Sequence, residues 1–273
     1  MRSSAPSNRP SVGVLIRFAN SAETLPSVLA ALKGQTLPPD MILGVANQST
    51  DGSVDLMKEA GACIVEWNET YEHSRVLNFG LHYITTDLVL ILSSHTVLDS
   101  PEAIAQMVDC CQDERVACAS ARWDSDAYYS DAVTWTELKS KGLRFGSIYS
   151  NSMGMIRRSL WRQKAFDESI PTAEDYDWAI AQLQKGHICR RLDLPFSYRR
   201  GGNVRDAEFA QIVFQFARKY QLRVAWLGVV GSFRHLLRHP GSVETQAVKQ
   251  RLQAWWHHVT ILAFLSQLKL KNA

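Results

Sequence analysis

The sequence lacks the cysteine patterns of secreted or zinc-binding proteins. Its 273 residues include an odd number of cysteines, and none has Cys-x-x-Cys spacing. This argues against a disulfide framework and against a zinc site, and it suits a reducing cytosol. The cysteines stand mostly in apolar surroundings, where we expect small core residues. They are Cys63, Cys110, Cys111, Cys118 and Cys189.

Long apolar segments and the common nucleotide motifs are also missing. Residues 1–10 are polar, without the apolar centre of a signal peptide, and the run 224–233 is roughly half the length that a membrane-spanning helix needs. No Gly-x-Gly-x-x-Gly follows the first expected strand, and no P-loop, Gly-x-Ser-x-Gly or His-Glu-x-x-His occurs. These absences exclude the dinucleotide fingerprint, P-loop nucleotide hydrolysis, the serine hydrolase elbow and the zincin site.

The composition is that of a globular protein with an uneven charge. The chain is 46% hydrophobic and has eight tryptophans, enough for a sizeable core. Its net charge of +3 divides into +7 over residues 205–273 and −4 over the remainder. We therefore expect a mildly acidic domain at 11–203 and a basic, Trp-containing helical extension at 204–273.

Alternating apolar strands and amphipathic helices predict an α/β fold. The order strand, helix, strand repeats over the first ~95 residues, which favours a parallel sheet with right-handed crossovers. Residues 124–143 are polar and irregular, and they predict a loop with a short helix. Expected strands are 12–16, 41–45, 63–67, 88–92, 116–122, 152–156 and 188–192, and expected helices are 22–33, from 53 onward, 76–84, 101–111 and 176–185.

Two groups of polar residues suggest a site. Polar side chains follow several strands at their carboxyl ends, where ligands bind in open α/β sheets. A carboxylate cluster, Glu174, Asp175 and Asp177, stands before an apolar helical run. Its alternative role is to complement the helix dipole. The strand-end residues are Arg17, Asn20, Asn47, Gln48, Ser49, Asp51, Ser93, Ser94 and His95.

Taken together, these residues resemble the family 2 glycosyltransferases with the GT-A fold. The resemblance covers about residues 11–195, and a bacterial rhamnosyltransferase-like subgroup has Ser-x-His, here Ser93-Ser94-His95, in place of Asp-x-Asp. The other matching segments are Gln35-Thr36, Ser49 to Ser53, His73-Ser74-Arg75 with Leu77-Asn78, and Asn151 to Phe166 followed by Glu174-Asp175.

The resemblance implies a single Rossmann-like domain with a mostly parallel sheet. It implies inverting transfer of a sugar from a nucleotide-diphosphate donor to a hydroxyl of a saccharide or lipid-linked acceptor, in surface polysaccharide or glycolipid synthesis. Asp175 would be the base, with Glu174 orienting it or holding the acceptor. The donor would contact Arg17, Asn20, Asn47, Ser49, Asp51, Arg75, Asn78, Ser93 and Ser94, and His95 would face a divalent metal.

Two departures from the family pattern keep alternatives open. Ala46-Asn47-Gln48 replaces two aspartates of the nucleotide loop, and Ser-Ser-His replaces the metal motif. Imidazole suits Mn²⁺ better than Mg²⁺. The competing hypothesis is a catalytically impaired binding protein with this fold. A nucleotidyltransferase is disfavoured because the Gly-rich phosphate loop after the first strand is missing.

Single residues also have structural alternatives. Asp51 would cap a helix, His95 would be a structural histidine, and Arg75 would be a surface cation. Trp178 is expected in the core rather than as a sugar platform.

The basic tail predicts either a helix lying on an anionic membrane surface or plain packing on the domain. Nucleic acid is disfavoured as a partner because the tail is too apolar. We expect a cytoplasmic protein, with peripheral association at the inner face of the cytoplasmic membrane under the first alternative.

Overall fold

A computed structural model describes residues 9–123, 128–144, 148–170, 172–199, 212 and 215–223. The chain forms two compact units, one from residues 1–135 with 146–201 and the other from 136–145 with 202–273. Most of the expected extension at 204–273 lies outside the described residues.

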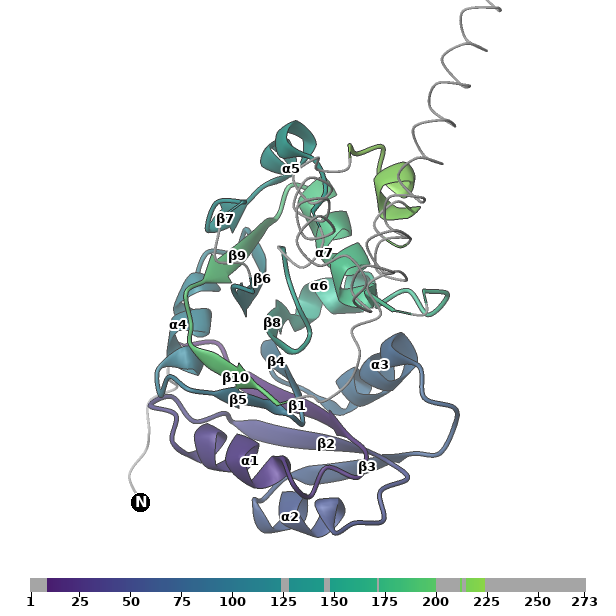
Figure 1. Ribbon diagram of the computed structural model, residues 1–273. Helices are drawn as coiled ribbons and strands as arrows, with labels where there is room; N and C mark the ends of the chain where they lie inside the picture. Colours follow the sequence, from purple (N-terminus) through teal and green to yellow (C-terminus); the bar gives the residue numbers. More distant parts are fainter. Residues whose placement is uncertain are drawn as a thin grey trace, which may run out of the picture. The chain divides into compact units, whose positions relative to one another are not determined.

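The first unit contains a mixed eight-stranded sheet of order β3-β2-β1-β4-β8-β6-β9-β7 (Figure 1). The pairs β3–β2, β2–β1, β1–β4 and β6–β9 are parallel, whereas β8 runs antiparallel to both β4 and β6. The strands are β1 (Val12–Phe18), β2 (Met41–Asn47), β3 (Cys63–Trp67), β4 (Leu88–Ser93), β6 (Val116–Ala121), β7 (Ala132–Val133), β8 (Met153–Arg157) and β9 (Ile188–Leu192).

Helices cover both faces of the sheet because its central strands are apolar on both sides. On one face, Val14 and Ile16 of β1 pack with buried residues of α1, α2 and α4. On the other face, Gly80 of α3 lies against Leu15 and leaves no room for a Cβ atom. The helices are α1 (Leu25–Lys33), α2 (Ser53–Glu59), α3 (His73–Tyr83), α4 (Ala103–Cys110), α5 (Trp135–Lys141), α6 (Arg158–Gln163) and α7 (Glu174–Gln184).

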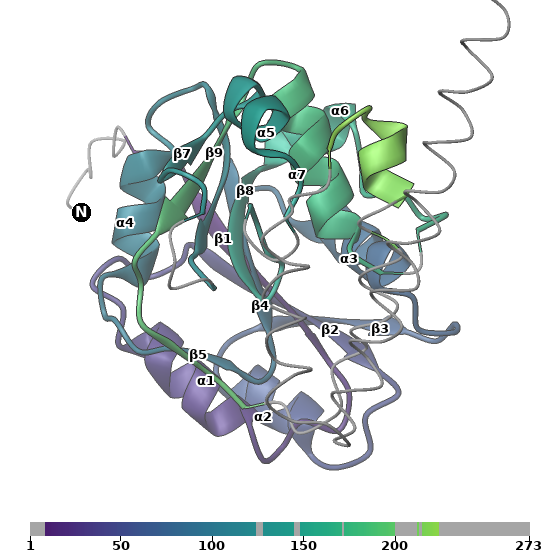
Figure 2. The same ribbon diagram turned by 45° about the horizontal axis from the view of Figure 1, so that its top comes forward.

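A small second sheet extends the carboxyl end of β4. The strand β5 (Thr96–Leu98) pairs antiparallel with β10 (Phe196–Tyr198), as Figure 2 shows. The chain turns at Ser94-His95 between β4 and β5, so β10 brings Tyr198 next to this turn.

The expected α/β class and all seven expected strands are confirmed, and four short elements were missed. The missed elements are β5, β7, β10 and α6, which are too short to show a hydrophobic period. The antiparallel placement of β8 was not expected either, because its apolar sequence is compatible with both directions.

The second unit is described only in part. Its residues include most of α5 and a helical stretch at 215–219. The Leu143 N–H donates to the Arg223 carbonyl, and the Arg223 guanidinium donates to the Ser140 carbonyl. Within the described part of the chain, no helix has the length and apolarity needed to cross a membrane.

Candidate active site

The carboxylate pair Glu174-Asp175 opens helix α7. Glu174 is 4% exposed, whereas Asp175 keeps part of its surface open to solvent. The preceding residue, Ala173, has φ of 64°, a left-handed conformation that costs a residue with a Cβ about 1–2 kcal/mol. The Ala173 carbonyl accepts the first N–H groups of the helix, from Tyr176 and Asp177. The strained residue therefore fixes the direction in which Asp175 leaves the backbone.

A second segment, just before β8, holds both carboxylates. The backbone N–H of Asn151 donates to Asp175 Oδ2 at 2.8 Å, and its side-chain Nδ2 donates to Glu174 Oε1 at 3.2 Å. The Tyr149 hydroxyl donates to Asn151 Oδ1 at 2.9 Å and so fixes the orientation of the Asn151 amide. Gly154 is required here, because a Cβ atom would collide with the Ser150 carbonyl and the Tyr149 ring.

These surroundings change the proton affinity of Asp175. Burial raises the pKa of Asp175 to about 7, and the adjacent Glu174 charge acts in the same direction. Hydrogen bonds from the N–H groups of Asn151 and Tyr176 oppose the rise, as does the charge of Arg17. A carboxylate with a pKa near 7 is both half-ionised and appreciably basic at neutral pH, which is the condition for efficient general base catalysis.

Arg17 is the cation on the sheet side of this pair. It lies at the carboxyl end of β1, in register with Ser93 of β4, and its Nε donates to the Tyr71 hydroxyl at 3.0 Å. Burial acts to lower the pKa of Arg17, but the Tyr71 hydroxyl and the charges of Glu174 and Asp175 outweigh burial, and the pKa is raised. Among the described residues, none accepts a hydrogen bond from its buried Nη1. A donor is therefore available for a ligand anion.

Several strand-end residues form one hydrogen-bonded loop network. The Asn20 N–H donates to Ser49 Oγ at 3.2 Å, and Asn20 Oδ1 accepts the Thr50 N–H at 2.9 Å. Asp51 accepts the Ala22 N–H at 2.8 Å and the Ser53 hydroxyl. The Ser53 hydroxyl lowers the pKa of Asp51. These bonds join the loops after β1 and β2, so the predicted residues Asn20, Ser49 and Asp51 do lie together.

The geometry of the loop network distinguishes residues with a structural role from residues that remain open to a ligand. Asn20 and Gln48 have φ of 44° and 49°, left-handed conformations that only a tightly held loop maintains. Asp51 uses both carboxylate oxygens inside the protein, which agrees with a structural role more than with a nucleotide contact. Asn47 ends β2 opposite Trp67 of β3, half-buried at the same edge of the sheet.

The Ser93-Ser94-His95 turn joins this network to the base. Ser94 Oγ lies 2.9 Å from Ser21 Oγ, and the Ser93 N–H donates to the Ser152 carbonyl next to Asn151. The His95 ring packs edge-on against Tyr198 at 4.8 Å between centroids. Within the described ranges, no group of three or more His, Cys, Asp and Glu side chains is placed to hold a metal ion. One imidazole and two neutral hydroxyls do not fit a resident Mg²⁺, which prefers anionic oxygen ligands.

Two predicted donor contacts, Arg75 and Asn78, are engaged elsewhere. Both belong to α3. The Arg75 guanidinium pairs with Glu69 and lies 4.0 Å from Glu168. Asn78 is 5% exposed, and its amide binds the segment that begins with α6. Its Oδ1 accepts the Trp161 Nε1–H and the Phe166 N–H, and its Nδ2 donates to the Phe166 carbonyl and Glu168.

We therefore expect Asn78→Ala to destabilise the fold without changing ligand affinity per folded molecule. The substitution leaves the Trp161 and Phe166 N–H groups buried and unpaired, which costs about 3 kcal/mol. The test compares the unfolding midpoint in urea with donor affinity below that midpoint, and Asn68→Ala, an exposed asparagine, serves as the control. Unchanged stability together with a large loss of donor affinity would show that Asn78 contacts the donor, as the sequence predicted.

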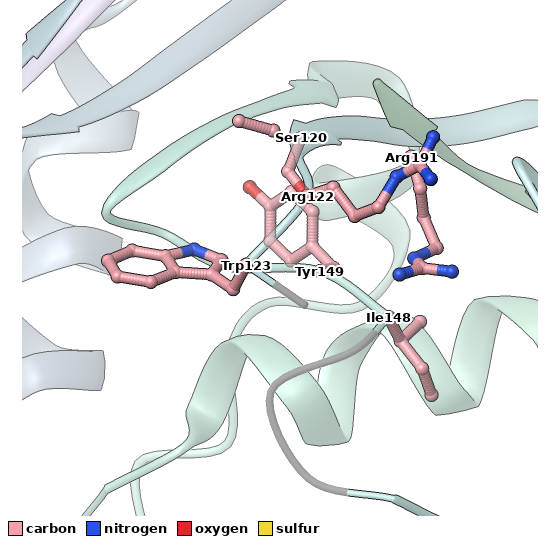
Figure 3. Close-up of a pocket in the computed structure, with 7 residues that line it drawn as sticks. Ser120, Arg122, Trp123, Ile148, Tyr149 and Arg191 are labelled. Atoms are coloured by element: carbon pink, nitrogen blue, oxygen red, sulfur yellow. The ribbon is translucent and has the colours of Figure 1, made fainter. Parts of the chain in front are cut away.

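Tyr149, whose hydroxyl donates to Asn151, also lines a pocket. Figure 3 shows Tyr149 among its lining residues, with the Trp123 indole extending away from Arg191 and Ile148. Arg122 is paired with Asp131 at 2.8 Å, and Arg191 donates to the Tyr129 carbonyl, so both cations are already engaged. The lining residues are Ser120, Ala121, Arg122, Trp123, Ile148, Tyr149 and Arg191.

Two contributors to this site, Tyr149 and Ala173, were not expected from the sequence, and neither carries a recognisable motif. Asn151, which holds both carboxylates, was expected only as the first residue of a segment that matches the family. Trp178, by contrast, is confirmed as a core residue: it is fully buried, and its Nε1 donates to the Lys164 carbonyl at 2.7 Å.

Solved structures of glycosyltransferases share this fold. A mannosyltransferase from Pyrobaculum calidifontis, in complex with GDP-Man and Mn²⁺, has a TM-score of 0.63 at 20% identity over 97% of this chain and 82% of that one. TarS from S. aureus in complex with UDP-GlcNAc has a TM-score of 0.58 at 14% identity, over 76% of this chain and 66% of that one. At these identities the likeness establishes the GT-A fold.

Two sequence comparisons add to the structural ones. The O-antigen chain rhamnosyltransferase RfbN of Salmonella typhimurium (strain LT2) is 24% identical over 195 residues, which are 64% of this chain and 62% of that protein. The chain thus spans less than two thirds of the length of this curated relative. The family model described as Glycosyl transferase family 2 matches residues 13–169, more than half of the chain. The chain is a member of glycosyl transferase family 2.

Proposed function

We propose that the protein transfers a sugar from a nucleotide-diphosphate donor to a hydroxyl acceptor, with inversion at the anomeric carbon. The observation that carries the proposal is Asp175, a partly exposed carboxylate of helix α7 with a pKa of about 7. The Asn151 N–H donates to it, and it follows the end of the family 2 match at residues 13–169 by six residues. The similarity to an O-antigen chain rhamnosyltransferase supports a deoxyhexose or hexose donor and a role in surface polysaccharide synthesis.

The reaction is a single displacement. The acceptor oxygen attacks the anomeric carbon, its proton passes to Asp175, and the bond between that carbon and the diphosphate oxygen breaks. Because attack and departure occur on opposite sides, the anomeric configuration inverts. Glu174 keeps Asp175 basic through its charge, and Asn151 holds both carboxylates in place.

The departing diphosphate needs positive charge, and Arg17 is the residue we assign to it. Its guanidinium lies at the carboxyl end of β1, and its Nη1 has no acceptor among the described residues. Arginine binds phosphate oxygens in a bidentate manner. The loops fixed by Asn20, Ser49 and Asp51 would position the nucleotide, with Asn47, Ser93 and Ser94 at the same sheet edge.

A divalent metal has limited support from this chain. Solved glycosyltransferases of this fold contain Mn²⁺, including a glucosyl-3-phosphoglycerate synthase from Mycobacterium tuberculosis with a TM-score of 0.53 at 16% identity, over 76% of this chain and 77% of that one. In the Ser93-Ser94-His95 turn, His95 is the side chain that suits Mn²⁺, and its ring is packed on Tyr198. We derive no step of the reaction through a metal.

A catalytically impaired binding protein is the second candidate. It is favoured by Ala46-Asn47-Gln48, which has no carboxylate for the nucleotide base, and by the lack of a metal cluster among the described side chains. This candidate predicts donor binding without turnover.

A donor screen tests the proposal. We expect one class among UDP-, GDP- and dTDP-sugars to raise the melting temperature of the protein by several degrees, since a ligand at 100 times its Kd stabilises the fold by about 2.7 kcal/mol. Running the screen with Mn²⁺ and with EDTA separates metal dependence from donor identity.

NMR of the product on a saccharide acceptor should show the opposite anomeric configuration from the donor. A product with retained configuration would refute the single displacement. Binding without any transfer would favour the impaired protein.

A further inference from the structure

Two exposed aromatic rings lie in contact beside the His95 turn. Trp123 is 42% exposed and Tyr198 is 37% exposed. Their centroids are 5.1 Å apart at an interplanar angle of 77°. The Tyr198 ring also contacts the His95 ring, at a centroid distance of 4.8 Å. Only two other large apolar side chains, Tyr71 and Tyr83, are exposed in the described part of the chain. An exposed aromatic pair of this kind is therefore unusual in this protein.

The pair is connected to the proposed base through the pocket of Figure 3. Trp123 lines the pocket of Figure 3 together with Tyr149. The Tyr149 hydroxyl binds Asn151, and the Asn151 N–H binds Asp175. Two hydrogen bonds thus link the wall of this pocket to the carboxylate that would accept the proton. A molecule resting on Trp123 would therefore lie at a pocket whose wall is hydrogen-bonded, through Asn151, to the proposed base.

The size and charge of the surface select its occupant. Two partly exposed aromatic rings offer on the order of 200 Å², whereas a stable protein interface needs about 800 Å² from each partner. The neighbouring Arg122 is already paired with Asp131, so the surface offers no free charge from this residue to an anionic ligand. A small neutral molecule with one apolar face fits both conditions.

We propose that Trp123 and Tyr198 bind a neutral pyranose ring of a saccharide acceptor, a proposal that rests on the glycosyl transfer proposed above. One face of a pyranose carries several axial C–H groups, which are attracted to the negative face of an aromatic ring. The hydroxyls at the rim of the sugar remain free for the polar groups nearby. One ring of the acceptor would pack on Trp123, and its reacting hydroxyl would point toward Asp175.

Fluorine NMR of the full chain labelled with 5-fluorotryptophan tests the proposal directly. The Trp123 signal is identified as the one that disappears in Trp123→Phe. Four probes, the methyl glycosides of α-L-rhamnose, α-D-mannose, β-D-galactose and N-acetyl-β-D-glucosamine, are each titrated to about 50 mM, since single-ring binding is in the millimolar range. We expect at least one to shift the Trp123 signal saturably while signals of distant tryptophans stay fixed. A Trp123 signal that none of the four moves overturns the proposal.

Kinetics with matched variants separate this proposal from the proposed function. Trp123→Ala and Tyr198→Ala should raise the KM for the acceptor about tenfold and leave donor affinity unchanged, and Tyr198→Phe should retain the wild-type value. Tyr83→Ala, which removes an exposed ring from α3, is the control. An unchanged acceptor KM in both alanine variants would contradict the proposal even if transfer occurs. If no donor binds, the proposal of glycosyl transfer is refuted. The fluorine NMR result still decides whether Trp123 binds a sugar ring.

Discussion

Asp175→Asn is expected to lower the rate of glycosyl transfer by about 10²–10⁴-fold, the usual cost of losing a general base. Donor affinity should stay nearly the same, because Asp175 acts on the acceptor. The measurement compares kcat with the donor Kd from calorimetry in the same preparations. In the wild type the Asp175 carboxylate accepts a hydrogen bond from the Asn151 N–H, and in the variant an amide takes its place. Melting temperatures are therefore recorded in parallel, to detect any loss of stability.

The control for this variant is Asp55→Asn. Asp55 is an exposed aspartate in the first turn of α2, so like Asp175 it stands in the first turn of a helix, but without the same surroundings. Removing a first-turn carboxylate costs about 0.3–1 kcal/mol of stability through the helix dipole. If Asp175→Asn behaves like Asp55→Asn, losing a little stability and no activity, the carboxylate pair only complements the dipole.

The pH dependence of the wild type follows from the same residue. A raised pKa means that Asp175 is protonated below about pH 7, and a protonated carboxyl accepts no proton. Transfer should therefore fall on the acidic side of pH 7, about tenfold per pH unit, and level off above it. Glu174 and Arg17 are the titratable groups with the largest effects on the pKa of Asp175. Because Arg17 lowers the pKa, Arg17→Met should move the acidic limb to higher pH, whereas Arg17→Lys should keep it near its original place.

Gly154→Ala is expected to reduce transfer about 10²-fold and to destabilise the protein by about 1–3 kcal/mol. The added methyl group would lie 2.5 Å from Cε2 of Tyr149 and even closer to the Ser150 carbonyl. Neither is the free end of a flexible chain, so the backbone before β8 has to move. Asn151 moves with this backbone, and it holds both carboxylates.

Gly34→Ala is the matched control for this substitution. A Cβ atom at Gly34 meets the Ala30 carbonyl oxygen at 3.5 Å, an ordinary contact, and φ at this position is −80°. We expect wild-type transfer and little change in unfolding. Equal behaviour of the two alanine variants would show that the segment before β8 is not needed to position Asp175.

Most of the fold could be predicted from the sequence because its signals are local. The apolar runs of β1 and β4 and the alternation with helices are visible in any window of about ten residues. The direction of β8 is not visible in this way, since it depends on which neighbours it finds. The short strands β5 and β10 form only because they pair with each other, 98 residues apart at Leu98 and Phe196.

The site was harder to predict because its bonds are long-range. Asn78 resembles a donor contact in sequence, but its partners lie 88 residues away at Phe166. Arg75 carries the positive charge that a diphosphate requires, yet its guanidinium forms an ion pair with Glu69. Asn151 stands at the start of a segment that matches the family, but its sequence neighbours do not reveal its bond to Asp175, 24 residues away.

The position of β8 has a consequence for the protein during synthesis. Strand β4, with the sequence Leu-Val-Leu-Ile-Leu-Ser, is buried throughout and takes β8 as the neighbour on one side. Until the ribosome has released residues 153–157, that side of β4 is an unpaired apolar edge, the kind of segment that associates with other chains. A nascent chain of about 150 residues should therefore need a chaperone, and fragments that stop before β8 should aggregate although they contain all of β1 to β4.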